Sequence, residues 1–496
     1  MLLQHLKDLF IKSLDMKYFK NICFVLLTAS CLIACTDEFE EINENPNSPE
    51  TVEPQFLLTN VISVAIDQNT YAQGFDQSNY FAHFHAALDF GFIDRYIIGP
   101  NSTYWATLNG LQTDINSIKA SPNSNEAYNA VGDIMSCFLY SQMTDMWNDV
   151  PYTEAQRLED GIDKPKYDTQ ESIYTDPDTG ILAVLTRSAA TLENTTQSIR
   201  GDVMFNNDLD KWVRFANSLK LRYLMRISKR LTDYTEIQSL ANSGKLMQSN
   251  ADNAILPYLA AAPNQFPFFL SSVGGLVEHV MSSTVDSVFA LWDDPRVAVL
   301  YKPVAEGLNN DTVYYRGIQN GQTAETVATL GIGIDDLSEV GSRFRDVPDG
   351  ANGQFMQYAE VQFALAEAAE RGYITGDANT FYENAIRASF DYYEVEVPAD
   401  YFTREAIALN GTDNIIKIMT QKWLSLINNG HEAWYNIRRT GIPTIVAGPD
   451  AVNDGRYPVR YLYPESEQAT NAANYAEAVA RIGGDNINSK GWWEKD

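Results

Sequence analysis

The sequence has little cysteine, a deficit of basic charge and, beyond residue 35, no long hydrophobic run. Only 4 of its 496 residues are cysteine, so a framework of disulfides is not expected. Lysine and arginine number 36 against 65 aspartates and glutamates, which gives a net charge of −29. So acidic a chain lacks the positive surface that holds a phosphate backbone, which argues against nucleic-acid binding. No apolar run of about 18 residues follows residue 35, so we expect no membrane-spanning helix there.

The first 35 residues have the pattern of an export signal. A short basic region, 16–21, precedes an apolar stretch, 22–34, that is too short to span a bilayer. The tetrapeptide LIAC, which ends at Cys35, is similar to the bacterial lipobox, whose cysteine is acylated after cleavage. We therefore expect a lipid anchor at Cys35 that holds the mature protein at a membrane surface. A plain signal peptide with an incidental cysteine is the alternative.

These features divide the chain into four segments. Residues 1–15 contain two aspartates before the basic region and are interpreted as a mis-assigned upstream segment, with the signal peptide at 16–34. Residues 35–54 are expected to form a lipidated, extended lead-in, whose acidic tract 37–41 resembles the surface-export signal of Bacteroidetes lipoproteins or is a solvated tether. Residues 55–496 are expected to form a single body, in which Cys137 has no partner cysteine.

Helical periodicity dominates this body and predicts an all-α fold. Apolar residues recur at three- and four-residue spacing in nine stretches. These are 55–67, 102–119, 125–147, 181–198, 209–231, 355–371, 378–393, 413–428 and 471–482. The pair 355–371 and 378–393, joined by a glycine turn, is typical of a degenerate tetratricopeptide unit, which needs stacked neighbours to bury both faces.

Two regions interrupt the helical pattern. Residues 250–345 are rich in glycine, proline, asparagine and aromatic residues, and 441–465 have the pattern of short strands and turns. We expect a loop-rich half with short β-hairpins. Long irregular segments on a rigid scaffold commonly carry binding sites, so we expect the ligand there.

Motifs of catalysis are scarce. The sequence contains no serine elbow, Walker loop or dinucleotide glycine pattern. His83 and His85 diverge on a helix and lack further ligands nearby, so no metal site is expected. Acidic loops would suit a structural Ca²⁺, but no spacing indicates one, and we expect no cofactor. Paired carboxylates are too numerous to exclude a glycosidase, although nothing favours one.

Aromatic residues are the best candidates for ligand contacts, since flat rings stack on the apolar faces of sugars. Trp212, Phe363, Phe381 and Trp423 follow helical patterns and are interpreted as core residues. Rings in aperiodic segments are equally suited to packing or to ligand binding. They are Phe92, Tyr96, Phe266, Phe268, Tyr314 and Tyr315. Arg316, beside the last two, could meet a carboxylate.

Several short stretches of the sequence resemble motifs of a known protein family. Residues 145–155 read DMWNDVPYTEA and resemble the D-x-[WY]-G-D-[VI]-P-Y-[TS]-E-A turn of the SusD/RagB family, nutrient-binding outer-membrane lipoproteins of Bacteroidetes. Asn148 stands where the family usually has glycine, and asparagine tolerates the same left-handed backbone. Further similar strings follow in order along the chain. They are 164–174, 212–226, 294–296, 359–368, 434–441, 483–485 and 492–493.

The resemblance implies a SusD-like fold of tetratricopeptide-like helix pairs and a role without catalysis. It implies that the protein binds an extracellular glycan at the cell surface and delivers it to a SusC-type TonB-dependent transporter. The sequence leaves three alternatives open: peptide or glycopeptide cargo, a surface glycoside hydrolase, and a purely structural helix-repeat scaffold. It does not name the ligand.

Overall fold

The computed structural model describes residues 52–70, 77–271, 279–304 and 313–495. The chain divides into two units, Met1–Val52 and Glu53–Asp496, and the second holds every element described below. The expected upstream segment, the signal peptide and Cys35 lie outside the described residues. Within the described part, no helix is both long enough and apolar enough to cross a bilayer.

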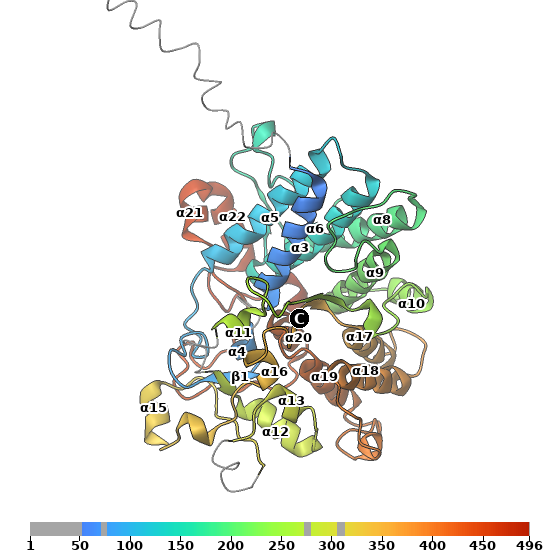
Figure 1. Ribbon diagram of the computed structural model, residues 1–496. Helices are drawn as coiled ribbons and strands as arrows, with labels where there is room; N and C mark the ends of the chain where they lie inside the picture. The colour runs from blue at the N-terminus through green and yellow to red at the C-terminus, as the bar shows by residue number, and fades with distance from the viewer. Residues whose placement is uncertain (1–51, 71–76, 272–278, 305–312, 496) are drawn as a thin grey trace, which may run out of the picture. The chain divides into compact units, whose positions relative to one another are not determined.

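Helices form the scaffold, as the periodicity predicted. The nine predicted stretches correspond to α3 (Pro54–Asp67), α5 (Ser102–Ala120), α6 (Glu126–Trp147), α8 (Ile181–Asn194), α9 (Leu209–Arg226), α17 (Tyr358–Glu370), α18 (Ala378–Tyr392), α19 (Asn414–Ser425) and α22 (Ala472–Ile482). Figure 1 shows α5, α6, α8 and α9 packed in succession, and α17 packs on both α18 and α19. The all-α prediction is confirmed.

Polar caps explain where several of these helices begin. The side chain of Asn125 accepts the backbone N–H groups of Ala127 and Tyr128 at the start of α6. Asp208 and Asp377 do the same at the starts of α9 and α18. Such caps satisfy N–H groups that the first helical turn leaves without partners. Asn148, which ends α6, has φ +71°, a backbone conformation that explains why glycine suits this position.

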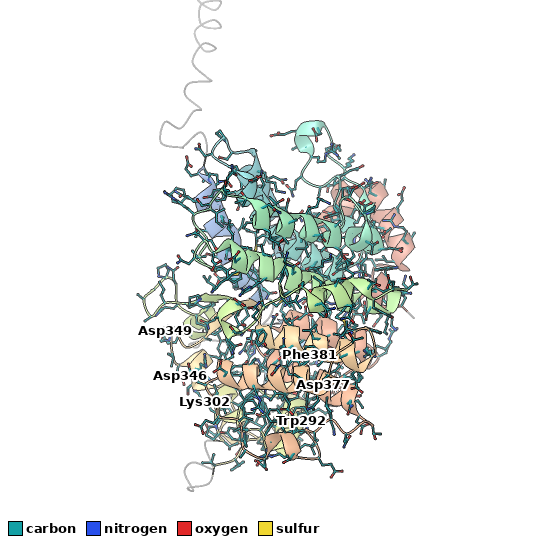
Figure 2. All side chains as sticks on the ribbon, turned by 90° about the vertical axis from the view of Figure 1, so that its right-hand side faces the viewer. Trp292, Lys302, Asp346, Asp349, Asp377 and Phe381 are labelled. Carbon is teal, nitrogen blue, oxygen red and sulfur yellow. The ribbon has the colours of Figure 1, made fainter. Side chains whose placement is uncertain are left out.

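The core rings are placed as the helical pattern predicted. Trp212, Phe363 and Trp423 are fully buried. Phe381, labelled on α18 in Figure 2, is partly buried and packs against the core. These rings therefore stabilise the contacts between helices.

The loop-rich half contains more helix than its composition indicated. Between the scaffold elements lie α4 (Asn79–Phe81), α7 (Gln170–Thr175), α10 (Thr235–Asn242), α11 (Pro267–Ser271), α12 (Ser283–Trp292), α13 (Val297–Leu300), α15 (Ala324–Thr329), α16 (Ser342–Arg345), α20 (Gly430–Thr440) and α21 (Glu465–Thr470). Helix α12 was missed because its apolar residues sit among many turn formers.

The strands are short and pair in twos. β1 (His85–Ala87) pairs with β5 (His279–Met281), β2 (Val150–Pro151) with β3 (Tyr167–Asp168), and β4 (Ala254–Pro257) with β6 (Asn352–Met356), all antiparallel. The pairs β1–β5 and β4–β6 join segments distant in sequence, whereas β2 and β3 are consecutive antiparallel strands. Residues 441–465 contain no strand, so that prediction was wrong. These residues instead make isolated backbone hydrogen bonds to other segments, such as the one that Tyr461 N donates to Met146 O.

Two arginines one turn apart on α9 tie four helices together. Arg222 donates to both carboxylate oxygens of Glu360 on α17, at 2.7 and 2.6 Å. Arg226 donates to Glu432 on α20, at 2.5 Å, and to Asp145 on α6. All five side chains are at most 5% exposed. Each charge is therefore buried but paired, which is the condition under which buried charges are tolerated.

A second buried pair fastens α17 to α20. Arg439 donates to the two oxygens of Glu367 at 2.7 and 2.6 Å. Burial alone would raise the pKa of Glu367, but the Arg439 guanidinium outweighs it and holds that pKa at about 2. The ionised pair therefore persists at any physiological pH.

We expect Arg226→Met to lower the free energy of unfolding by about 3–5 kcal/mol, because it leaves Asp145 and Glu432 buried without their partner. Arg157→Met is the matched control: Arg157 pairs with Asp160 at the surface, where an ion pair contributes less than about 1 kcal/mol. Urea denaturation followed by tryptophan fluorescence measures both. Equal midpoints for the two variants would contradict a structural role for the buried charges.

Candidate ligand-binding surface

Three loops distant in sequence meet in the loop-rich half: 88–98, 319–326 and 446–453. We call the face they form the loop surface. Asp450 connects two of them, because its carboxylate accepts from Thr323 N at 2.8 Å and its N–H donates to Gly321 O at 3.0 Å. Arg95 connects the first to the third, since its Nε donates to Asp450 O at 3.1 Å and its carbonyl accepts from Val452 N at 3.0 Å.

The loop surface displays large apolar side chains to solvent. They are Phe90 (71% exposed), Phe92 (57%), Ile97 (39%), Val446 (67%) and Val452 (53%). Large apolar side chains this exposed, on loops that bond to one another, mark a candidate binding site. Two phenyl rings with open faces are suited to stacking on sugar rings, while nearby polar groups take up hydroxyls.

Phe90 is held in an unfavourable backbone conformation. Its φ is +52°, in the left-handed region, which costs a bulky residue about 1–2 kcal/mol. Local bonds maintain it: Phe90 N donates to Asp89 Oδ1 at 2.7 Å, and Phe92 N donates to Phe90 O at 2.7 Å. Backbone strain of this kind concentrates at binding sites, where the fold fixes a side chain in its working position.

Asp94 fixes the loop from beneath. It is 2% exposed, and its carboxylate accepts from Ala87 N at 3.2 Å, Gly321 N at 3.0 Å and Asn320 Nδ2 at 2.6 Å. Burial raises the pKa of Asp94 to about 6, against the opposing effect of these three donors. A single side chain therefore couples the loop that carries Phe90 and Phe92 to loop 319–326.

The loops approach so closely that glycine is needed at one crossing point. A Cβ atom at Gly448 would lie 1.8 Å from the carbonyl oxygen of Asn320. Any larger residue would push the third loop away from the second.

The structure distributes the predicted ligand residues among different environments. Phe92 lies on the loop surface, as expected of a ligand-binding ring. Tyr314 is 36% exposed, Arg316 is exposed, and Tyr315 lines a cavity beside α12 that is described below. These four remain predictions, since the structure holds no ligand.

Three predicted ligand rings are instead core residues. Tyr96, Phe266 and Phe268 are at most 2% exposed and offer no face to a ligand. Tyr96 packs edge-on against Tyr457, and Phe266 against Tyr258. Their segments lack periodicity because the backbone is irregular, yet an irregular backbone can still turn a side chain inward. Tyr96 contributes indirectly, since its ring anchors the loop that carries Phe92.

Phe90 and Asp94 were missed by the sequence analysis. Two phenylalanines separated by one glycine in an aperiodic segment were a usable signal for Phe90. Nothing in the sequence marked Asp94, because its partner loop lies more than two hundred residues away.

The carboxylates that connect the three loops are engaged in hydrogen bonds within the protein. The carboxylate of Asp94 is occupied by N–H donors, and that of Asp450 accepts from Thr323 and Thr326. His83 is buried, which lowers its pKa to about 3, and its Nδ1 lies 2.9 Å from Thr284 Oγ1. Among the residues the structure describes, no group of three histidines, cysteines or carboxylates could hold a metal ion.

We expect Asp94→Asn to loosen the loop surface while leaving both rings in place. The amide exchanges one acceptor oxygen for a donor that faces other donors, at a cost of at least about 1 kcal/mol. Amide hydrogen exchange in residues 88–97 should accelerate by a factor of about 5 or more. Asp89→Asn, an exposed change in the same loop, is the control and should leave exchange beyond Phe90 unaltered. Identical protection in both variants would show that Asp94 does not fix the loop.

Comparison with known proteins identifies the family of the chain. A SusD-like family model, described as starch-binding and associating with the outer membrane, matches residues 46–464. A SusD homolog from Bacteroides fragilis is 26% identical, with a TM-score of 0.79 over 90% of this chain and all of that one. A chitin-binding protein is 25% identical, with a TM-score of 0.77 and the same coverage.

A chitin-binding SusD homolog from Flavobacterium johnsoniae, at 23% identity and a TM-score of 0.76, covers 89% of this chain and 98% of its own and shows the same fold. No curated protein matches the sequence. Because the family model spans most of the chain and the helical fold agrees, the chain belongs to the SusD-like family of starch-binding proteins that associate with the outer membrane.

Proposed function

We propose that this protein captures an extracellular glycan on the loop surface and passes it, unaltered, to a SusC-type TonB-dependent transporter. The observation that carries the proposal is the pair of exposed rings, Phe90 and Phe92, on a loop fixed by Asp94 and strained at Phe90. Rings held rigidly in solvent lose little entropy when a ligand arrives, which favours binding. The family's description as starch-binding and the chitin-binding relatives support a glycan as the ligand.

The proposed location is the outer face of the outer membrane, with a lipid on Cys35 as anchor. The lipobox-like tetrapeptide and the acidic tract 37–41 support this location, as does the family's association with the outer membrane. Several acyl chains on one cysteine would hold the protein stably, whereas a single chain would bind reversibly.

A peptide is the second candidate ligand. The negative charge of Asp286 near Arg316 argues against it. Burial raises the pKa of Asp286, and Arg316 is close enough to oppose that rise, so the positive charge of Arg316 is partly compensated. A peptide carboxylate reaching Arg316 would meet Asp286 as well. A neutral glycan avoids this repulsion.

We expect the double variant Phe90→Ala, Phe92→Ala to lose at least about tenfold in glycan affinity, or ~1.4 kcal/mol. A form without the anchor cysteine, residues 36–496, should first be tested by affinity electrophoresis against soluble starch, glycol chitin and a panel of plant and host polysaccharides. Isothermal titration with maltohexaose and N-acetylchitohexaose then gives the affinity. Release of reducing ends should be measured in the same samples.

Phe56→Ala is the matched control, because Phe56 is 62% exposed on α3, away from the three loops. It should bind as the wild type does. Equal loss in both variants would remove the loop surface as the binding site. Release of reducing ends by the wild type would replace capture with hydrolysis, and binding to none of these polysaccharides would refute the glycan proposal.

We expect Cys35→Ala to abolish incorporation of radiolabelled palmitate in cells that produce the precursor. Cys137→Ala is the control: Cys137 is buried on α6, so its loss should leave labelling unchanged. Protease added to intact cells should degrade the wild-type protein if it faces outward. Labelling that persists in Cys35→Ala would contradict the anchor.

A further inference from the structure

A cavity of about 440 Å³ opens beside α12, apart from the residues that form the loop surface. One wall is α12, which contributes Phe289 and Ala290, and the opposite wall includes Tyr315. Phe289 is buried and packed in the core, whereas Tyr315 is half-buried and partly packed against it. The volume falls within the range of small-molecule sites and would hold one or two sugar rings.

The polar groups of the cavity are mainly acceptors. Asp286 takes a hydrogen bond from Gly317 N to its Oδ2 at 2.9 Å. No other bond to its carboxylate occurs among the described residues, which leaves Oδ1 available. The Asp293 side chain is 95% exposed, and its Oδ2 lies 3.9 Å from Arg404 Nη2, beyond hydrogen-bond distance. Both carboxylates can therefore accept hydrogen bonds from a ligand.

The remaining charged groups of the cavity are already satisfied. Asp294 is bound by Arg296 and by the hydroxyl of Tyr401. Arg404 donates hydrogen bonds to the carboxylate of Asp400, at 3.1 and 3.0 Å, and to the backbone carbonyls of Trp292 and Asp293. Among the described residues that line the cavity, the available polar groups are acceptors beside an aromatic wall, and the cation Arg404 is already hydrogen-bonded.

We propose that this cavity is a second carbohydrate site, in which a sugar ring packs on Tyr315 and donates its hydroxyls to Asp286 and Asp293. The inference rests on the proposed function and extends it. Because the free polar groups are carboxylates, the site selects neutral or amino sugars and disfavours uronic, sulfated or sialic acids.

One glycan chain can engage both sites. Gly317 N binds the cavity residue Asp286, and Gly321 N binds Asp94 beneath the loop surface. Four residues of extended backbone span at most ~14 Å, so the segments that build the two sites lie close together. Linked binding of this kind raises the affinity for a long glycan above that of either site alone.

Ala290→Trp tests the inference, because Ala290 is exposed on α12 and lines the cavity, so a bulky ring there fills it from the solvent side. Ala190→Trp, the same change at an exposed position of α8, is the matched control. Asp286→Asn is a second variant, since an amide oxygen can still accept from Gly317 N. The probes are soluble starch, glycol chitin, maltotriose and N-acetylchitotriose.

We expect Ala290→Trp to weaken binding of the polysaccharide about tenfold and to reduce the number of trisaccharides bound per chain from two to one. Asp286→Asn should weaken the second trisaccharide by about fivefold, and Ala190→Trp should change neither quantity. Phe90→Ala, Phe92→Ala should retain one weak trisaccharide site, which Ala290→Trp then removes.

One trisaccharide per wild-type chain, lost with Phe90 and Phe92 and unaffected by Ala290→Trp, would overturn the second site and leave the proposed function standing. If the wild type binds neither the starch-derived nor the chitin-derived probes, both the second site and the proposed function are overturned. Tighter binding of polygalacturonate than of the neutral polysaccharides would overturn the assigned sugar class.

Discussion

The structure depends on the buried ion pairs that radiate from α9. Arg222 and Arg226 lie one turn apart, and their carboxylate partners come from α6, α17 and α20. Apolar packing alone would let these helices slide, because apolar contacts have no preferred register. Charged hydrogen bonds in a dry interior have strict geometry, so they fix which turn of each helix faces α9. Asp145, the first residue of the DMWNDVPYTEA string, therefore serves the scaffold.

A rigid scaffold permits irregular loops to hold binding residues in costly conformations. The loop surface has no regular strand of its own; side chains such as Asp94 and Asp450 satisfy the N–H groups of neighbouring loops. Each such bond replaces one that a sheet would provide. Phe90 keeps its positive φ because the surrounding contacts hold its loop in place. The exposure of the Phe90 ring to solvent therefore depends on all three loops of the loop surface.

Periodicity predicted the nine scaffold helices because each buries one face, and burial repeats every three to four residues. The candidate site was only partly predictable for the opposite reason. Phe92 and Tyr96 stand four residues apart in the same aperiodic loop, yet one faces solvent and the other the core. Which way each ring points depends on the φ values of 90 and 96 and on contacts from loops 319–326 and 446–453. No local pattern encodes contacts of that range.

The proposed transfer of the ligand to a transporter requires binding sites that are open to solvent and of moderate affinity. A protein that hands its ligand to a partner must release it, so very tight binding at one deep pocket would hinder transfer. Two shallow sites that a long glycan bridges combine firm retention of the polymer with rapid release of each sugar ring. In the proposed sites, the aromatic rings would supply attraction that tolerates many sugars, while the carboxylates of Asp286 and Asp293 would add preference by charge. An acidic protein is thereby suited to collecting neutral chains, which its negative surface does not repel.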